Sequence, residues 1–91
     1  MLRSPIHPGV FLRRLLNEHG LTSVALARHI GVDAKMIAQV CSGRKSMTAT
    51  LAVKLSAAVG TTAEFWLNLQ NAYALSKTDR PTLIKPLIRA A

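Results

Sequence analysis

Two polar side chains in the first half of the chain have the spacing of one helix face. Lys35 and Gln39 lie four positions apart in a stretch with helical periodicity. Lysine can donate to the O6 and N7 acceptors of guanine, and glutamine can pair with N6 and N7 of adenine. Ala34 and Met36 beside them could contact a thymine methyl group. We therefore expect Ala34, Lys35, Met36 and Gln39 to meet base edges, although Lys35 could instead contact a phosphate or remain solvated.

A second group of polar residues suits phosphate oxygens rather than bases. Thr22 and Ser23 stand at the start of a predicted helix, where free N–H groups and hydroxyls can hold an anion. The segment 42–46 combines hydroxyl and basic side chains and has no acidic neighbour. The expected phosphate contacts are Thr22, Ser23, Ser42, Arg44, Lys45 and Ser46. The residues of segment 42–46 could instead belong to a solvated loop that contacts no DNA.

The other reactive side chains do not form a catalytic or metal-binding set. His7, His19 and His29 are spaced too widely for a zinc site, and no Cys or carboxylate lies in register with them. Four acidic residues leave little material for paired-carboxylate catalysis. We expect no enzyme, no metal and no cofactor. His7 should help to begin the first helix, His29 should lie on the surface, and Cys41 should be a small packing residue.

Composition indicates one small basic domain. The 91 residues are 49% hydrophobic with four aromatic side chains and one cysteine, so we expect an aliphatic core and no disulfide. No apolar run approaches the length of a membrane span, and we expect a cytoplasmic protein. The net charge of +8 divides unevenly: +5 in residues 1–45, 0 in 46–76 and +3 in 77–91. A basic front half favours nucleic acid as a partner.

Helical periodicity and capping residues predict five short helices and an all-α domain over residues 1–76. The first helix should follow Pro8-Gly9 and end at Gly20. The next three should start at the caps Thr22, Asp33 and Thr48, and the fifth at Thr61 or Thr62, ending near Ser76. Phe65 and Trp66 are residue types that stack on bases, but Leu69 and Tyr73 follow at helical spacing, so we expect them in the core.

Residues 22–42 have the pattern of a helix-turn-helix. Ala27 is small where two helices would cross, Gly31 permits a positive φ in the short turn, and Val32 can fill the gap between the helices. Ile37 and Val40 would anchor the second helix so that its other face looks outward. An ordinary helical hairpin is the alternative, and the basic charge of this half favours DNA binding.

The tail, residues 77–91, differs from the domain. Pro81 and Pro86 do not fit the interior of a helix, so we expect an extended segment that could include a short strand at 82–85. Its apolar side chains should pack on a second chain or back on the domain, because exposed they would be a liability. These side chains are Leu83, Ile84, Leu87 and Ile88.

Over residues 7–75 the sequence resembles the HigA family of antitoxins, in the lambda-repressor-like class of helix-turn-helix proteins. The run Glu64-Phe65-Trp66-Leu67-Asn68-Leu69-Gln70 is the most specific part of the match, since ordinary helix-turn-helix repressors lack it. Further matching segments are His7-Pro8-Gly9, Leu26-Ala27, Gly31-Val32, 42–48, Leu55, 59–62 and 71–73. The resemblance implies a homodimer that represses its own operon at a palindromic operator. It also implies binding and neutralisation of a HigB-type toxin, a ribosome-dependent mRNA endonuclease.

The sequence departs from the family where a base-reading helix would begin. Ala34-Lys35-Met36 replaces an Arg-Gln-Thr-like turn, and Gln39 stands where a second basic residue is frequent. The operator sequence therefore does not transfer. Two alternatives stay open: a stand-alone helix-turn-helix regulator (an orphan antitoxin), and a toxin-binding module whose DNA-reading helix has lost its function. The altered first turn favours the second alternative, and so does the negative charge of Asp33, which would lie near the phosphates.

The toxin-binding surface is not set by the sequence. Candidates are the first helix, with Arg13 and Arg14, and the tail, although the tail with the fifth helix could instead form the dimer. Toxins of this family are usually basic, as this chain is. A complex would therefore need local acidic groups, such as Glu18 or Asp79, or apolar contacts.

Overall fold

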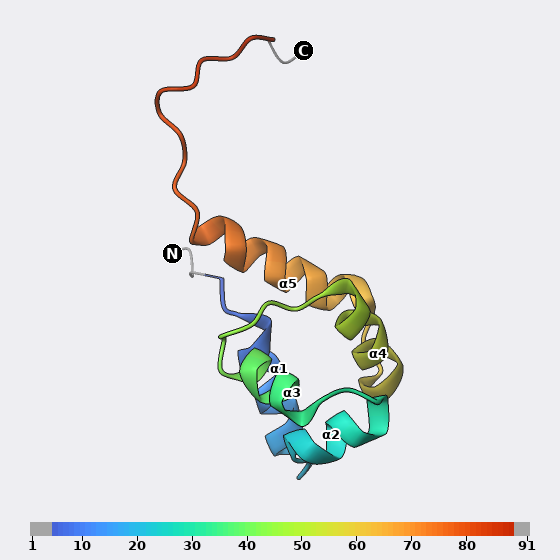
Figure 1. Cartoon of the computed structure of the whole chain (residues 1–91). Helices are drawn as coiled ribbons and strands as arrows, with labels where there is room; N and C mark the ends of the chain where they lie inside the picture. Colours follow the sequence, from blue (N-terminus) through green and yellow to red (C-terminus); the bar gives the residue numbers. More distant parts are fainter. Residues whose placement is uncertain (1–4, 89–91) are drawn as a thin grey trace.

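A computed structural model describes residues 5–88, which form five helices and an extended tail (Figure 1). Helix α2 packs on α3, α4 packs on α5, and α1 contacts both α3 and α5. Helix α5 lies along one edge of the domain in Figure 1, against α4 and α1, and its C-terminal end lies near the start of the described chain. The helices are α1 (Pro8–Glu18), α2 (Ser23–Ile30), α3 (Ala34–Cys41), α4 (Ala49–Val59) and α5 (Ala63–Ser76). The all-helical fold expected from the sequence is confirmed.

Capping residues explain where four of the helices begin. The side chains of Thr22, Asp33, Thr48 and Thr62 each accept a hydrogen bond from a backbone N–H in the first turn of the following helix. At the other ends, Gly31 and Gly60 adopt the left-handed conformation, with φ of 73° and 76°, and end α2 and α4. The glycine predicted in the helix-turn-helix turn therefore has the conformation for which we expected it.

Helix α1 starts earlier than predicted. Pro8 and Gly9 were expected to precede the helix, but they form its first two residues. His7 is the cap, and its Nδ1 accepts a hydrogen bond of 2.9 Å from the Gly9 N–H. Proline suits the first helical position because its φ is already helical and its missing N–H would have no partner there. His7 thus has the role expected for it, and the helix begins two residues earlier than predicted.

The core is aliphatic apart from one indole. Trp66 is fully buried, and its ring makes edge-to-face contacts with Phe11 and Phe65, so the aromatic residues of α5 pack internally as expected. The indole Nε1–H donates to the Thr61 hydroxyl at 2.6 Å. The other buried apolar residues are Leu12, Leu16, Leu26, Ala27, Ile37, Val40, Cys41, Met47, Leu51, Ala52 and Leu55.

The tail contradicts one expectation. Residues 82–85 form no strand, because no segment among residues 5–88 pairs with their backbone N–H and C=O groups. The tail leaves the end of α5 and runs away from the helices (Figure 1). Leu83 and Leu87 are 93% and 101% exposed, so their packing back on the domain is also excluded. No helix in the described part of the chain has the length and apolar character to cross a membrane.

Candidate nucleic-acid interface

The outward face of α3 presents Lys35 and Ala38, which are exposed, together with half-exposed Gln39. The opposite face is held in the core by Ile37 and Val40, 0% and 1% exposed. This arrangement fits the spacing argument that placed Lys35 and Gln39 on one surface.

Two of the expected base-contacting residues lie closer to the core than their neighbours. Ala34 and Met36 are half-buried and pack against the hydrophobic core. They flank the outward face of α3 instead of standing at its centre. Only the exposed parts of these two side chains are therefore free to meet a base, whereas Lys35 and Gln39 are less restricted.

Asp33 has a structural function at the start of α3. Its Oδ1 accepts a hydrogen bond of 2.9 Å from the Lys35 N–H. A carboxylate at this position also interacts favourably with the positive end of the helix dipole. Its negative charge is therefore explained by capping, which weakens the argument that Asp33 marks a decayed DNA reader.

The segment 42–46, which we call the basic loop, leaves the end of α3 with all five residues exposed. The backbone carbonyl of Gln39 holds its first part. It accepts from the N–H of Arg44 at 2.9 Å and of Lys45 at 3.2 Å, and from the Ser42 hydroxyl at 3.1 Å. Gly43 makes the turn possible with φ of 81°. The expected phosphate contacts Ser42, Arg44, Lys45 and Ser46 are thus all exposed, directly after the helix that we expect to meet base edges.

The basic loop is also supported from behind. The Met47 N–H donates to Oε1 of Gln70 on α5 at 2.7 Å, and the Met47 side chain is buried. The ring of His7 lies against the loop, since a Cβ added at Gly43 would be 3.9 Å from its Cγ. Burial lowers the pKa of His7, and a hydrogen bond with the Lys45 backbone opposes this in part. Gln70 therefore supports the loop, a role that the sequence analysis did not assign to it.

The expected contacts at the start of α2 lie beside two residues that the sequence reasoning did not assign to DNA. A hollow of about 500 Å³ is lined by Thr22 and Ser23 together with Arg13 and Asn17 of α1. Ala38 of α3 lies on the same hollow, which therefore adjoins the base-reading face. Arg13 and Asn17 are four positions apart on one helix, and this spacing was the available signal.

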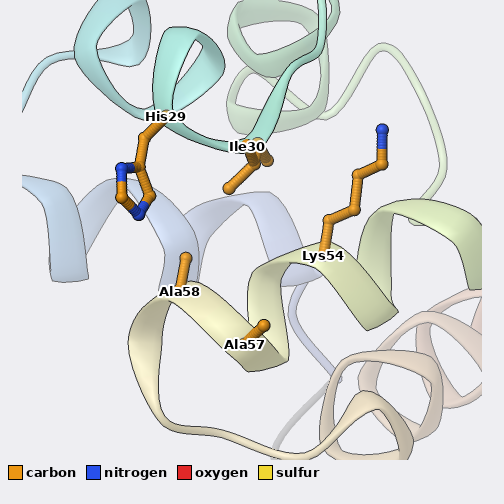
Figure 2. Close-up of a pocket in the computed structure, with 5 residues that line it drawn as sticks. All are labelled: His29, Ile30, Lys54, Ala57 and Ala58. Atoms are coloured by element: carbon orange, nitrogen blue, oxygen red, sulfur yellow. The ribbon is translucent and has the colours of Figure 1, made fainter.

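A separate groove lies between α2 and α4, and none of its lining residues is among the expected DNA contacts. Its volume is about 240 Å³, and His29 and Ile30 of α2 face Lys54, Ala57 and Ala58 of α4 across it (Figure 2). In Figure 2 the Lys54 side chain runs along the groove with its amino group pointing away from Ala57 and Ala58. Lys54 is therefore a basic residue that lies outside the candidate interface.

Comparison with known proteins identifies the family. A family model described as helix-turn-helix matches residues 12–66. Antitoxin HigA-1 of Vibrio cholerae is 38% identical over 91 residues, which cover 93% of this chain and 86% of that protein. The chain belongs to the HigA family of antitoxins. This HigA-family chain is accordingly a helix-turn-helix antitoxin and not an enzyme, as the resemblance in its sequence implied.

Two solved structures share the fold of this HigA-family chain. Antitoxin GraA is 41% identical with a TM-score of 0.77, and the match covers 81% of each chain. PA4674 from Pseudomonas aeruginosa, solved in complex with its 18-base-pair operator DNA, is 36% identical with a TM-score of 0.77. That match covers 84% of this chain and 82% of the other.

Proposed function

We propose that this antitoxin binds as a homodimer to a palindromic operator of its own operon and represses it. The observation that carries this proposal is the exposed Lys35–Gln39 face of α3 with the basic loop directly beside it. PA4674, a relative of the same fold, was solved with its operator DNA, which supports the assignment. A dimer would place two such faces about 34–36 Å apart, or at a multiple of this distance, to match the groove spacing of DNA.

The contacts divide into two kinds. Lys35 and Gln39 would read base edges, with Ala34 and Met36 limited to thymine methyl contacts by their partial burial. Phosphate contacts would come from the basic loop and from the start of α2. Arg13 joins this second group because it lines the same hollow as Thr22 and Ser23.

Lys45 and Lys54 form a matched pair for testing the interface. Lys45→Ala should weaken binding to operator and to unrelated DNA alike, about three- to tenfold, and lower the slope of log affinity against log salt by about one. Lys54→Ala removes the same charge from the α2–α4 groove and should change neither quantity. Gel-shift titrations at several salt concentrations measure both effects. An unchanged slope for Lys45→Ala would remove this residue from the interface.

We propose further that the chain binds and neutralises a HigB-type toxin, an mRNA endonuclease, as its family implies. Copurification with the product of the adjacent gene tests this, with the full chain as bait. Capture of a small protein that arrests translation supports the proposal. If the chain shifts its promoter DNA but captures no toxin, it acts as a stand-alone regulator. If it captures the toxin but shifts no DNA, its reader has decayed.

A further inference from the structure

We propose that His7, Gln70 and Tyr73, all outside the helix-turn-helix, are positioning residues that hold the basic loop where it can contact phosphates. The inference rests on the proposed operator binding and names the residues on which its phosphate contacts depend. It assigns part of the DNA-binding function to the N-terminal segment and to α5.

The basic loop has few supports of its own. All five of its residues are exposed, and the backbone N–H groups of residues 42–45 donate to carbonyls at the end of α3, those of Ala38, Gln39 and Val40. These bonds tie the backbone to α3 as far as Lys45, but they do not hold Ser46 or the end of the loop that leads to Met47. The rest of the loop must be fixed from another part of the fold.

Gln70 fixes the far end of the loop. Its Oε1 accepts from the Met47 N–H at 2.7 Å, across 23 positions of sequence. The Met47 side chain is 3% exposed, so the chain enters the core directly after Ser46. The Met47 N–H is partly buried, so removing the Gln70 acceptor would leave this N–H unpaired. The backbone at the end of the loop would then shift until the N–H finds another partner.

His7 fixes the middle of the loop. Its Nδ1 accepts from the Gly9 N–H, so in the neutral ring the proton lies on Nε2, which is then a donor. The Lys45 backbone is the hydrogen-bond partner that raises the pKa of the ring against the effect of burial, and a Cβ on Gly43 would lie 3.9 Å from the ring Cγ. His7 is 6% exposed, so its orientation is set by packing. One imidazole thus links the start of α1 to the backbone of the residue expected to meet phosphate.

Tyr73 holds the imidazole in place. The two rings meet edge to face, with centroids 5.0 Å apart and planes at 80°. Tyr73 lies about one turn after Gln70 on α5, so both supports come from one side of one rigid helix. A shift of α5 would therefore move both supports of the loop together.

Substitutions of His7 can separate capping from loop positioning. In His7→Asn the amide oxygen lies where Nδ1 was, so the cap of α1 is kept and the link to Lys45 is lost. In His7→Gln the amide nitrogen reaches the position of Nε2, so the link is kept and the cap is lost. For the other support, Gln70→Met removes the acceptor at similar size, and Asn71→Met makes a comparable change at the next, exposed position.

The measurements are operator affinity, the salt slope and thermal unfolding of the full-length protein. We expect His7→Asn and Gln70→Met to weaken binding about three- to tenfold on all DNA and to lower the salt slope by about one, as loss of a phosphate contact would. His7→Gln should melt at a lower temperature but keep the wild-type slope, and Asn71→Met should change neither. A destabilised but correctly placed loop would not lower the slope.

Folded His7→Asn and Gln70→Met proteins with the wild-type affinity and slope would overturn the inference. If His7→Asn does not fold, Gln70→Met decides the question alone. If the wild-type chain itself shifts no operator DNA, the proposed function fails, and that result is distinguishable from a failure confined to the variants.

Discussion

At the scale of single residues, Gln39 has two separate functions in one position. Its backbone carbonyl accepts the hydrogen bonds that begin the basic loop, and any residue type supplies that carbonyl. Its side chain, half-exposed on the same face as Lys35, is the part available to DNA. Substitution at this position therefore tests base reading without disturbing the loop.

Gln39→Ala should weaken binding to the operator by about 1–3 kcal/mol and relax specificity at one base pair, because a bidentate contact to adenine would be lost. Binding to a scrambled duplex should stay within experimental error, since no phosphate contact changes. Competition titrations with operator variants measure both. An equal loss on operator and scrambled DNA would assign Gln39 to the backbone instead.

His7 predicts a pH dependence of stability. Burial lowers its pKa in the folded chain below the ordinary value of 6.5, so folding favours the neutral ring. The groups that face it are Tyr73 of α5 and the backbone of Lys45, and Lys77 lies beyond the Tyr73 ring, 5.6 Å from its centroid. This contribution to stability is complete above pH 6.5 and is lost as the pH falls below it, through the folded pKa.

Unfolding by urea at about pH 5 and about pH 7.5 measures this effect. The wild-type chain should be less stable at the lower pH, and His7→Asn should lose less between the two, because asparagine does not titrate. His19 and His29 are exposed and remain in both proteins as an internal control. The same decrease in both proteins would show that another group is responsible.

What the sequence could predict at this scale was local. Lys35 and Gln39 were placed on one face by their spacing, and Asp33 and Thr22 were recognised as caps. The bond between Met47 and Gln70 was not predictable, because it joins residues 23 positions apart and depends on how α5 packs on the other helices. The partial burial of Ala34 and Met36 also depends on tertiary packing, which periodicity alone does not resolve.

At the scale of elements, the close approach of α1 to α3 decides how the reading helix is presented. A Cβ added at Gly9 would lie 1.8 Å from the carbonyl oxygen of Val40 and 2.9 Å from Cα of Cys41. These are backbone atoms, so a clash cannot be relieved by a side chain. The glycine of the His7-Pro8-Gly9 segment therefore lets the start of α1 lie directly on the end of α3.

Gly9→Ala should accordingly destabilise the fold by about 3 kcal/mol or more, since α1 and α3 would have to separate. Operator affinity should also fall, because α3 carries the base-reading face. Val10→Ala, at the neighbouring exposed position, should cost less than about 0.5 kcal/mol. Chemical denaturation of the two variants provides the comparison. A Gly9→Ala protein as stable as Val10→Ala would mean that the two helices do not approach so closely.

Helix starts were predictable wherever a favoured capping residue, threonine or aspartate, precedes the helix, and α1 with its histidine cap is the exception. Pro8 and Gly9 read as a turn because both residues are common in turns, and histidine is not among the favoured caps. The helix begins there nevertheless, because the close contact of Gly9 with α3 requires a residue without Cβ, and Pro8 suits the first helical position. Tertiary packing thus overrides the local turn signal.

At the scale of the whole molecule, the tail combines a net positive charge with exposed apolar side chains. The helix-turn-helix lies in the half with net charge +5, whereas the tail has a net charge of +3 that the helix-turn-helix does not explain. Ile84 and Ile88 are 76% and 86% exposed, and Leu75 near the end of α5 is 56% exposed. These exposed apolar side chains, at the end of α5 and in the tail, are surface that a second chain would cover.

Deleting residues 77–91 should convert the dimer that we propose into a monomer, as measured by the mass in solution. The melting temperature of the domain should change little at low protein concentration, because Leu83, Ile84, Leu87 and Ile88 are exposed and add nothing to its core. Operator affinity should fall sharply, since one reading helix would bind each half-site independently.

A second variant separates apolar contact from charge, because the deletion also removes a net charge of +3. Serine at the four apolar positions 83, 84, 87 and 88 keeps every charge of the tail. If apolar contact forms the dimer, this variant is monomeric at the same salt concentration as the deletion. A dimer that survives the deletion would exclude the tail and leave α5 as the dimer surface. A dimer that survives only the serine variant would mean that tail charges or backbone hydrogen bonds hold the two chains together.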